Sequence, residues 1–148
     1  MTPGISIDDE GTFLVNGEPV THERTLEVLW SGLSTAPGGG WQVRVGREVA
    51  PVAVGETPFV VTAVVDAGED GRSGATLRLA GGATEPLQPA SLRVGADGVL
   101  RATLASGHAA RFSRAAQVAL GARLVEDPSA PGGYHLPLGG RRWPLGAD

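Results

Sequence analysis

Near its start the chain reads Ile5-Ser6-Ile7-Asp8-Asp9-Glu10-Gly11-Thr12-Phe13, and 87 residues further on it reads Leu92-Arg93-Val94-Gly95-Ala96-Asp97-Gly98-Val99-Leu100. Both stretches begin with the pattern apolar-x-apolar. After it come three further residues, a glycine, one residue of any type and another apolar residue. Alternation turns one face of a strand toward a core, and an acidic residue before glycine favours a tight turn. Each stretch therefore predicts a β-hairpin, and the two together indicate an internal repeat.

A second pair of stretches supports the repeat at an offset of 93 residues. Both have the order Gly-Gly-aromatic-x-apolar-x-apolar-Gly. They are Gly39-Gly40-Trp41-Gln42-Val43-Arg44-Val45-Gly46 and Gly132-Gly133-Tyr134-His135-Leu136-Pro137-Leu138-Gly139. The repeat predicts an α+β fold made of two tandem, similar small units, each with the order hairpin, helix, strand.

Each copy has a helix candidate between its two matched stretches. The first is predicted from about His22 to Leu33 with Thr21 as its N-cap, and the second from about Arg114 to Val125 with Ser113 as its N-cap. Gly121 weakens the second helix by about 1 kcal/mol relative to alanine. The apolar faces are formed by Leu26, Leu29, Trp30 and Leu33 in the first helix, and by Ala116, Leu120 and Leu124 in the second.

The region between the two copies is predicted to be stranded. Residues 59–65 form a nearly continuous run of β-formers, which is typical of a strand buried on both faces. Residues 66–74 are rich in glycine and acids and predict a loop. The segment 85–89 has two prolines, so we expect the junction of the two units there. The predicted domains are residues 1–83 and 84–148.

Composition limits the classes of function. The 148 residues include no cysteine, which excludes disulfides and thiolate metal sites, and no lysine, so that all 12 basic residues are arginine. The net charge of −4 argues against general nucleic-acid binding. Residues 1–83 carry −6 and residues 84–148 carry +2. This contrast predicts contact between the halves or a basic site in the second.

Targeting signals are not visible in the sequence. No apolar run approaches the roughly 20 residues of a membrane helix, and the first residues lack the basic and apolar regions of a secretion signal. We therefore expect a cytoplasmic protein that does not bind membranes.

Motifs for catalysis, cofactors and metals are weak. The sequence has neither GxGxxG after a strand, nor a phosphate-binding GxxxxGK[ST], nor a GxSxG nucleophile elbow. The acids at positions 8–10 are interpreted as a solvated turn. We expect no enzymatic activity, no cofactor and no metal. The histidines, His22, His108 and His135, lack metal-ligand spacing, although His135 is a candidate ligand contact.

The arginines of the second half are the most informative polar group. Arg111 and Arg114 stand at the predicted start of the second helix, where free N–H groups and the helix dipole favour anions. Arg141 and Arg142 precede Trp143, a combination that can hold a phosphate and a base. The alternative interpretation is a solvated terminal strand whose tryptophan covers the core edge.

Four segments, in this order, resemble a bacterial family known as Domain of Unknown Function 1285. The family pattern is I-x-I-x-x-x-G near the start, V-x-[ED]-x-P-F-x-V in the middle, A-R-[LF]-S-R before a helix and a late G-x-[FWY]-x-[LF]-P-L-G, which this chain matches loosely. The segments are Ile5 to Gly11, Val54 to Val61, Ala110 to Arg114 and Gly133 to Gly139.

This resemblance implies two similar α+β units that arose by duplication, the second loosely similar to pleckstrin-homology domains. It also implies a ligand site between the units, a nucleotide-like ligand and a role in signalling or stress. The matched residues that carry over are Glu56, Pro58, Phe59, Arg111, Ser113, Arg114 and Tyr134.

The leading hypothesis is a small binding or sensor protein for an anionic, nucleotide-like ligand held between the acidic and the basic unit. Its ligand-binding candidates are Glu56, Phe59, Arg111, Ser113, Arg114, Tyr134 and His135. The alternative is a protein–protein interaction module that binds a peptide along a strand edge and takes no small ligand.

Overall fold

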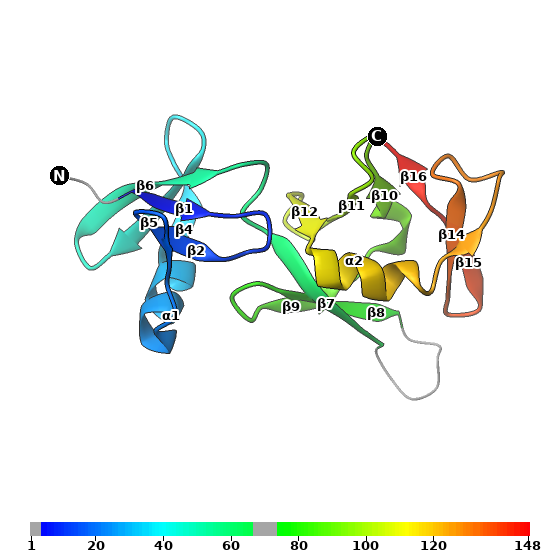
Figure 1. Cartoon of the computed structure of the whole chain (residues 1–148), viewed down its shortest axis with the longest axis horizontal. Coiled ribbons are helices and arrows are strands. Elements are labelled where there is room, and N and C mark those ends of the chain that lie inside the picture. The colour runs from blue at the N-terminus through cyan, green and yellow to red at the C-terminus, as the bar shows by residue number, and fades with distance from the viewer. Residues whose placement is uncertain (1–3, 67–73) are drawn as a thin grey trace. The chain divides into compact units, whose positions relative to one another are not determined.

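The computed structural model describes residues 4–66 and 74–148, so the loop expected at 66–74 lies mostly outside the described residues. The fold is α+β, as predicted, with mostly β-structure and two helices in the described parts of the chain. The chain divides into two compact units, Met1–Pro58 and Phe59–Asp148 (Figure 1).

The first unit has one mixed sheet in the order β3-β2-β1-β6-β5-β4. Its first two strands form the predicted hairpin, in which Ile7 pairs with Phe13, and Asp8 closes the turn by accepting hydrogen bonds from the backbone of Glu10 and Thr12, both at 2.9 Å. The strands are β1 (Ile5–Ile7), β2 (Phe13–Val15), β3 (Glu18–Pro19), β4 (Leu33–Thr35), β5 (Trp41–Val45) and β6 (Glu48–Val54).

The core of the first unit lies between this sheet and helix α1 (Glu23–Gly32). Leu29 is buried, and the indole ring of Trp30 meets the ring of Phe13 edge-on at 4.7 Å between centroids. The prediction of Thr21 as N-cap is wrong. His22 is the N-cap, because its Nδ1 accepts a hydrogen bond from the backbone of Thr25.

The second unit has a seven-stranded sheet in the order β16-β10-β11-β12-β7-β8-β9 and a three-stranded sheet in the order β13-β14-β15, both among the described residues. Its first strands are β7 (Val60–Asp66), β8 (Ala75–Leu79), β9 (Thr84–Pro86), β10 (Arg93–Val94), β11 (Leu100–Thr103) and β12 (Ala109–Phe112), with a 3-10 turn η1 (Pro89–Ser91). After helix α2 (Arg114–Gly121) come β13 (Val125–Glu126), β14 (Tyr134–Leu138), β15 (Arg141–Pro144) and β16 (Gly146–Ala147).

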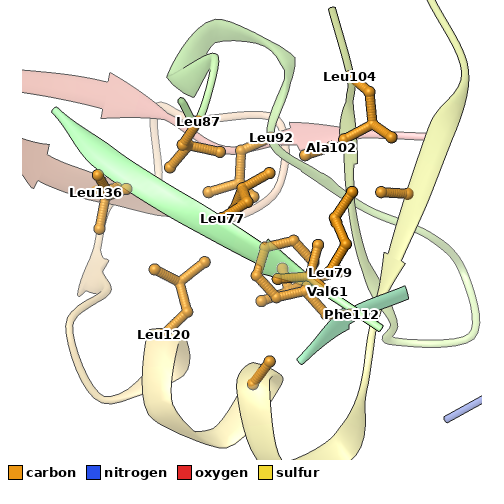
Figure 2. Packing of buried hydrophobic residues seen from close by; sticks show 14 of the residues in the cluster. Val61, Leu77, Leu79, Leu87, Leu92, Ala102, Leu104, Phe112, Leu120 and Leu136 are labelled. Carbon is orange, nitrogen blue, oxygen red and sulfur yellow. The ribbon is translucent and has the colours of Figure 1, made fainter. Parts of the chain in front are cut away.

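The core of the second unit gathers side chains from both sheets and from α2. Figure 2 shows Leu120 of α2 and Leu136 of β14 with side chains of β7, β8, β11 and β12 around them. Val60 and Val61 are fully buried in β7, whereas Val65 is 43% exposed, so the prediction of a strand buried on both faces holds for the beginning of residues 59–65 and not for their end.

The structure divides the chain after Pro58, whereas the sequence predicted a division after residue 83. The reason is that β7 lies between β12 and β8 in one sheet, so residues 59–83 belong to the second unit. The two prolines near 85–89 do not mark a junction. Pro86 lies in the edge strand β9, where a missing N–H is tolerated, and Leu87 is buried in the core.

Helix α2 begins where it was predicted to begin. Ser113 is its N-cap, and the Ser113 hydroxyl accepts a hydrogen bond from the Ala116 backbone at 3.2 Å. The helix ends at Gly121, four residues before the predicted end, because the chain turns there and the Leu124 N–H bonds to the Gly121 carbonyl.

The hairpins of the two units have the same strand register. In the first unit Ile7 pairs with Phe13, and in the second Val94 pairs with Leu100. The turn glycines Gly11 and Gly98 adopt φ angles of 85° and 79°, which favour glycine over other residues.

The strands that follow the helices correspond as well. Val45 pairs with Glu48, and Leu138 pairs with Arg141, each across a two-residue turn. The last strand of each set then pairs in parallel with the first hairpin: β6 with β1, and β16 with β10. Both units therefore contain the order hairpin, strand, helix, strand, hairpin. In the second unit β15 and β16 together take the place of β6, and β7, β8 and β9 are additional.

Candidate functional site

The structure brings four of the predicted site residues together where β12 passes into α2. The Arg111 N–H donates to the Phe59 carbonyl at 3.0 Å, and the Ser113 N–H donates to the Val61 carbonyl at 2.9 Å. Ser113 is buried and caps the helix, while Arg114 is the exposed first residue of α2. The ring of Phe59 lies 5.3 Å from the ring of His108.

Arg111 stands at one end of a row of three arginines that the sequence analysis did not recognise. Arg93 pairs with Arg101 across β10 and β11, and Arg101 pairs with Arg111 across β11 and β12. Residues directly opposite each other in neighbouring strands present their side chains on the same face of the sheet, and like charges there repel. The alternation of buried Ala102, Ala110 and Phe112 places this row on the face away from the core.

Arg93 and Arg101 of this row both pair with carboxylates. Arg93 forms an ion pair with Asp148, in which Nε lies 3.2 Å from Oδ1. Arg101 donates from both Nη atoms to the Asp97 carboxylate, at 2.8 and 3.2 Å. These hydrogen bonds from the Arg101 guanidinium hold the pKa of Asp97 well below its usual range.

Tyr134 and His135 lie next to each other in β14 but differ in their surroundings. Tyr134 is exposed, whereas His135 is buried and its Nδ1 lies 3.1 Å from Asp127 Oδ2. The Ser129 hydroxyl donates to Asp127 at 2.5 Å, and this bond, with smaller effects of the Ser129 backbone and of His135, lowers the pKa of Asp127. Burial opposes that shift.

The side chains of Ser129, Asp127 and His135 follow one another in this order along a chain of hydrogen bonds. A serine nucleophile requires the histidine next to the serine, with the carboxylate behind it. Here Asp127 occupies the middle, so this chain of hydrogen bonds ties the loop after β13 to β14 and does not activate Ser129.

Trp143 is held by the fold. Its Nε1 donates to the Leu138 carbonyl at 3.2 Å, its ring packs on the core, and the Arg141 guanidinium lies 4.4 Å from the ring centroid. These contacts agree with the interpretation of a terminal strand whose tryptophan covers the core edge. Glu56 belongs to the first unit, and the other predicted site residues belong to the second.

A cavity of about 340 Å³ lies within the second unit, against α2. Tyr134 is the one predicted site residue among the residues that line it. The cavity lies between the outer side of the helix, the β10–β11 hairpin and β14, and none of the described residues in its wall is charged. The wall consists of Val94, Gly98, Leu100, Gln117, Val118, Gly121, Leu124, Gly132, Tyr134 and Leu145.

Gln117 joins the helix to the hairpin at one side of this cavity. Its Nε2 donates to the Gly98 carbonyl at 2.8 Å, and its Oε1 accepts from the Leu100 backbone at 3.0 Å. Both ends of the amide are thereby engaged, so Gln117 acts as a fixed part of the wall.

Residues 4–66 and 74–148 offer neither a metal centre nor a membrane-spanning helix. No group of three histidine, aspartate or glutamate side chains there is arranged to hold a metal ion. Neither described helix has the length and hydrophobicity needed to cross a bilayer.

Comparison with solved structures identifies related folds. A DUF1285 family protein from Silicibacter pomeroyi DSS-3 superposes with a TM-score of 0.67 at 18% identity, covering 97% of this chain and 80% of that one. A DUF1285 family protein from Shewanella baltica OS155 gives a TM-score of 0.56 at 16% identity, covering 76% of this chain and 86% of that one. The predicted resemblance to this family is therefore confirmed at the level of the fold. No protein-family model and no curated protein matches the sequence.

Proposed function

We propose that this chain is a small cytoplasmic ligand-binding or sensor protein without catalytic activity of its own, and that its ligand is anionic and nucleotide-like. The observation that carries the proposal is the row formed by Arg93, Arg101 and Arg111. A phosphate that bridges arginines opposite each other on one sheet face relieves their repulsion and accepts charge-assisted hydrogen bonds.

Two neighbouring features support the same ligand class. Arg114 opens α2, where the helix dipole favours negative charge. Phe59, whose carbonyl accepts the Arg111 N–H, has its ring 5.3 Å from the ring of His108, and both rings are of the kind that stacks on a base. The placement of the ligand between the two units, with Glu56 from the first, stays a prediction, as does a role in signalling or stress.

Thermal unfolding against a panel of nucleotides, cyclic nucleotides and dinucleotides tests this function. A ligand at about 100 times its dissociation constant stabilises the folded state by roughly 2.7 kcal/mol. We expect one member of the panel to raise the melting temperature by several degrees.

The variants Arg111→Ala and Arg114→Ala should reduce that shift, and Arg142→Ala should preserve it as a matched control, because Arg142 is an exposed arginine of β15 outside the row. A panel without any shift, or equal affinities in the wild type and both arginine variants, contradicts the proposal. Pull-down of a defined protein partner by a chain that no nucleotide stabilises favours the alternative of an interaction module.

We further propose that the matching helices and strands of the two units derive from an internal duplication. Its support is the common register of the first hairpin, the helix cap and the last parallel pair in both units. Similarity of the second unit to pleckstrin-homology domains stays a prediction.

A further inference from the structure

The corresponding helices of the two units differ at one position in a way that bears on the cavity. Trp30 follows the N-cap His22 by eight residues, and Gly121 follows the N-cap Ser113 by eight residues. Trp30 packs edge-on against Phe13. Strand register places Leu100 in the second unit where the first unit has Phe13.

Five further residues of the cavity wall correspond to core positions of the first unit. Ile7, Leu26, Leu33, Trp41 and Val52 all belong to the hydrophobic core there. Their counterparts in the second unit, matched by strand register or by distance from the helix cap, all line the cavity. These counterparts are Val94, Gln117, Leu124, Tyr134 and Leu145, in that order. The cavity is thus the space that an indole ring fills in the first unit.

The fold does not require glycine at position 121. Gly121 has helical conformation, is absent from the glycines with positive φ, and a Cβ built on it meets no described heavy atom within 4 Å. Glycine in a helix is nevertheless less favourable than alanine because its backbone loses more freedom on folding. Gly121 therefore weakens α2 and leaves the cavity open.

We propose that this cavity binds a small, uncharged bicyclic aromatic molecule of about the size of indole. The volume of about 340 Å³ lies at the lower end of small-molecule pockets. Apolar cavities walled by aliphatic side chains take up aromatic rings of matching size. The described wall offers no charged partner, so a charged ligand loses hydration without compensation.

Tyr134 supplies a polar contact at this cavity. Its side chain lies in the wall, it is partly exposed, and its hydroxyl has no hydrogen-bond partner among the described residues. A ligand with one hydrogen-bonding atom, such as the N–H of an indole, can pair with this hydroxyl. The inference goes beyond the proposed anion site, and an uncharged probe tests it independently of the arginine row.

The test is a titration of the full chain with indole, followed by the amide signals of ¹⁵N-labelled protein. We expect saturable binding with a dissociation constant of about 1 mM or tighter, and the largest shifts at Gly98, Gly121 and Tyr134. Indole-3-carboxylate, which has the same rings and a negative charge, should bind at least about tenfold more weakly because its carboxylate finds no partner in the wall.

Filling the cavity should abolish binding. Gly121→Trp places an indole ring where the first unit has Trp30, and Gly121→Leu fills the space with a smaller side chain in case the tryptophan variant does not fold. Gly38→Trp is the matched control, because Gly38 lies in the first unit and a Cβ there also meets nothing within 4 Å.

Loss of indole binding in the Gly121 variants that fold, with binding retained in Gly38→Trp, supports the proposal. The proposal is overturned if the wild type shows no saturable binding of indole, if indole-3-carboxylate binds equally well, or if binding is unchanged in Gly121→Leu. Binding of a tryptophan-containing peptide by a chain that does not bind indole also overturns it, since the cavity then receives a partner's side chain.

Discussion

At the level of single residues, Asp127 links the solution pH to the stability of the second unit. Its pKa in the folded chain is lowered, chiefly by the hydrogen bond from the Ser129 hydroxyl. A carboxylate with a lowered folded pKa stabilises the fold above its unfolded pKa, near 4, and that contribution disappears as the pH falls through the folded value.

We therefore expect Asp127→Asn to unfold at a lower urea concentration than the wild type at pH 7, and the difference to shrink steadily below about pH 4. Urea unfolding curves between pH 7 and pH 2 measure this. Glu126→Gln removes a neighbouring exposed charge without touching Ser129 and serves as the control. A difference between wild type and Asp127→Asn that stays constant down to pH 2 rules out the linkage.

Single residues also show where sequence reasoning succeeded and where it stopped. The role of Ser113 as a cap was readable because a serine before a helical pattern has a strong positional preference. The cavity could not be predicted from the sequence in this way, because a pattern of apolar residues does not distinguish a filled core from an open one. The signal was present as Gly121, a helix-weakening residue at the helix position that corresponds to Trp30, and a position-by-position alignment of the two helices would have shown it.

At the level of elements, the cap of α2 connects the helix to the sheet. Ser113 receives the Ala116 N–H on its hydroxyl and gives its own N–H to Val61 in β7. We expect Ser113→Ala to lower the free energy of unfolding by about 1 kcal/mol, within the usual range of about 0.5–2 kcal/mol for a lost N-cap.

Urea unfolding at constant m-value measures this effect. Ser106→Ala, at an exposed serine in the β11–β12 turn, should change stability by less than about 0.5 kcal/mol. If Ser113 acts on a ligand and not on the helix, the two variants will instead have equal stability and differ in nucleotide response.

Elements differed in how well the sequence predicted them. Both hairpins were recovered because alternation and turn glycines are local signals. The end of α2 was predicted too late in the chain, since Leu124 continues the apolar face in the sequence while the backbone already turns after Gly121. The arginine row was missed because it depends on the pairing register of β10, β11 and β12, which brings together residues far apart in the sequence.

At the level of the whole molecule, the two prolines near residue 86 were a misleading boundary signal. Pro86 is tolerated because β9 is an edge strand, and the boundary is set by the sheet order, which places β7 beside β12 and β8 beside β7. Local composition does not report such a long-range pairing, so both hairpins were visible in the sequence while strands β7 and β8 of the second unit were assigned to the first.

The two boundaries predict different behaviour of separate fragments. A fragment of residues 59–148 keeps both sheets and the whole core of the second unit, so we expect it to unfold cooperatively in urea. A fragment of residues 84–148 loses Val61, Leu77 and Leu79 from that core, and loses the β7 carbonyl that receives the Ser113 N–H. We expect it to show no cooperative transition by circular dichroism. Cooperative unfolding of residues 84–148 at a midpoint similar to that of 59–148 would show that β7 and β8 are dispensable, and would restore the boundary that the prolines indicated.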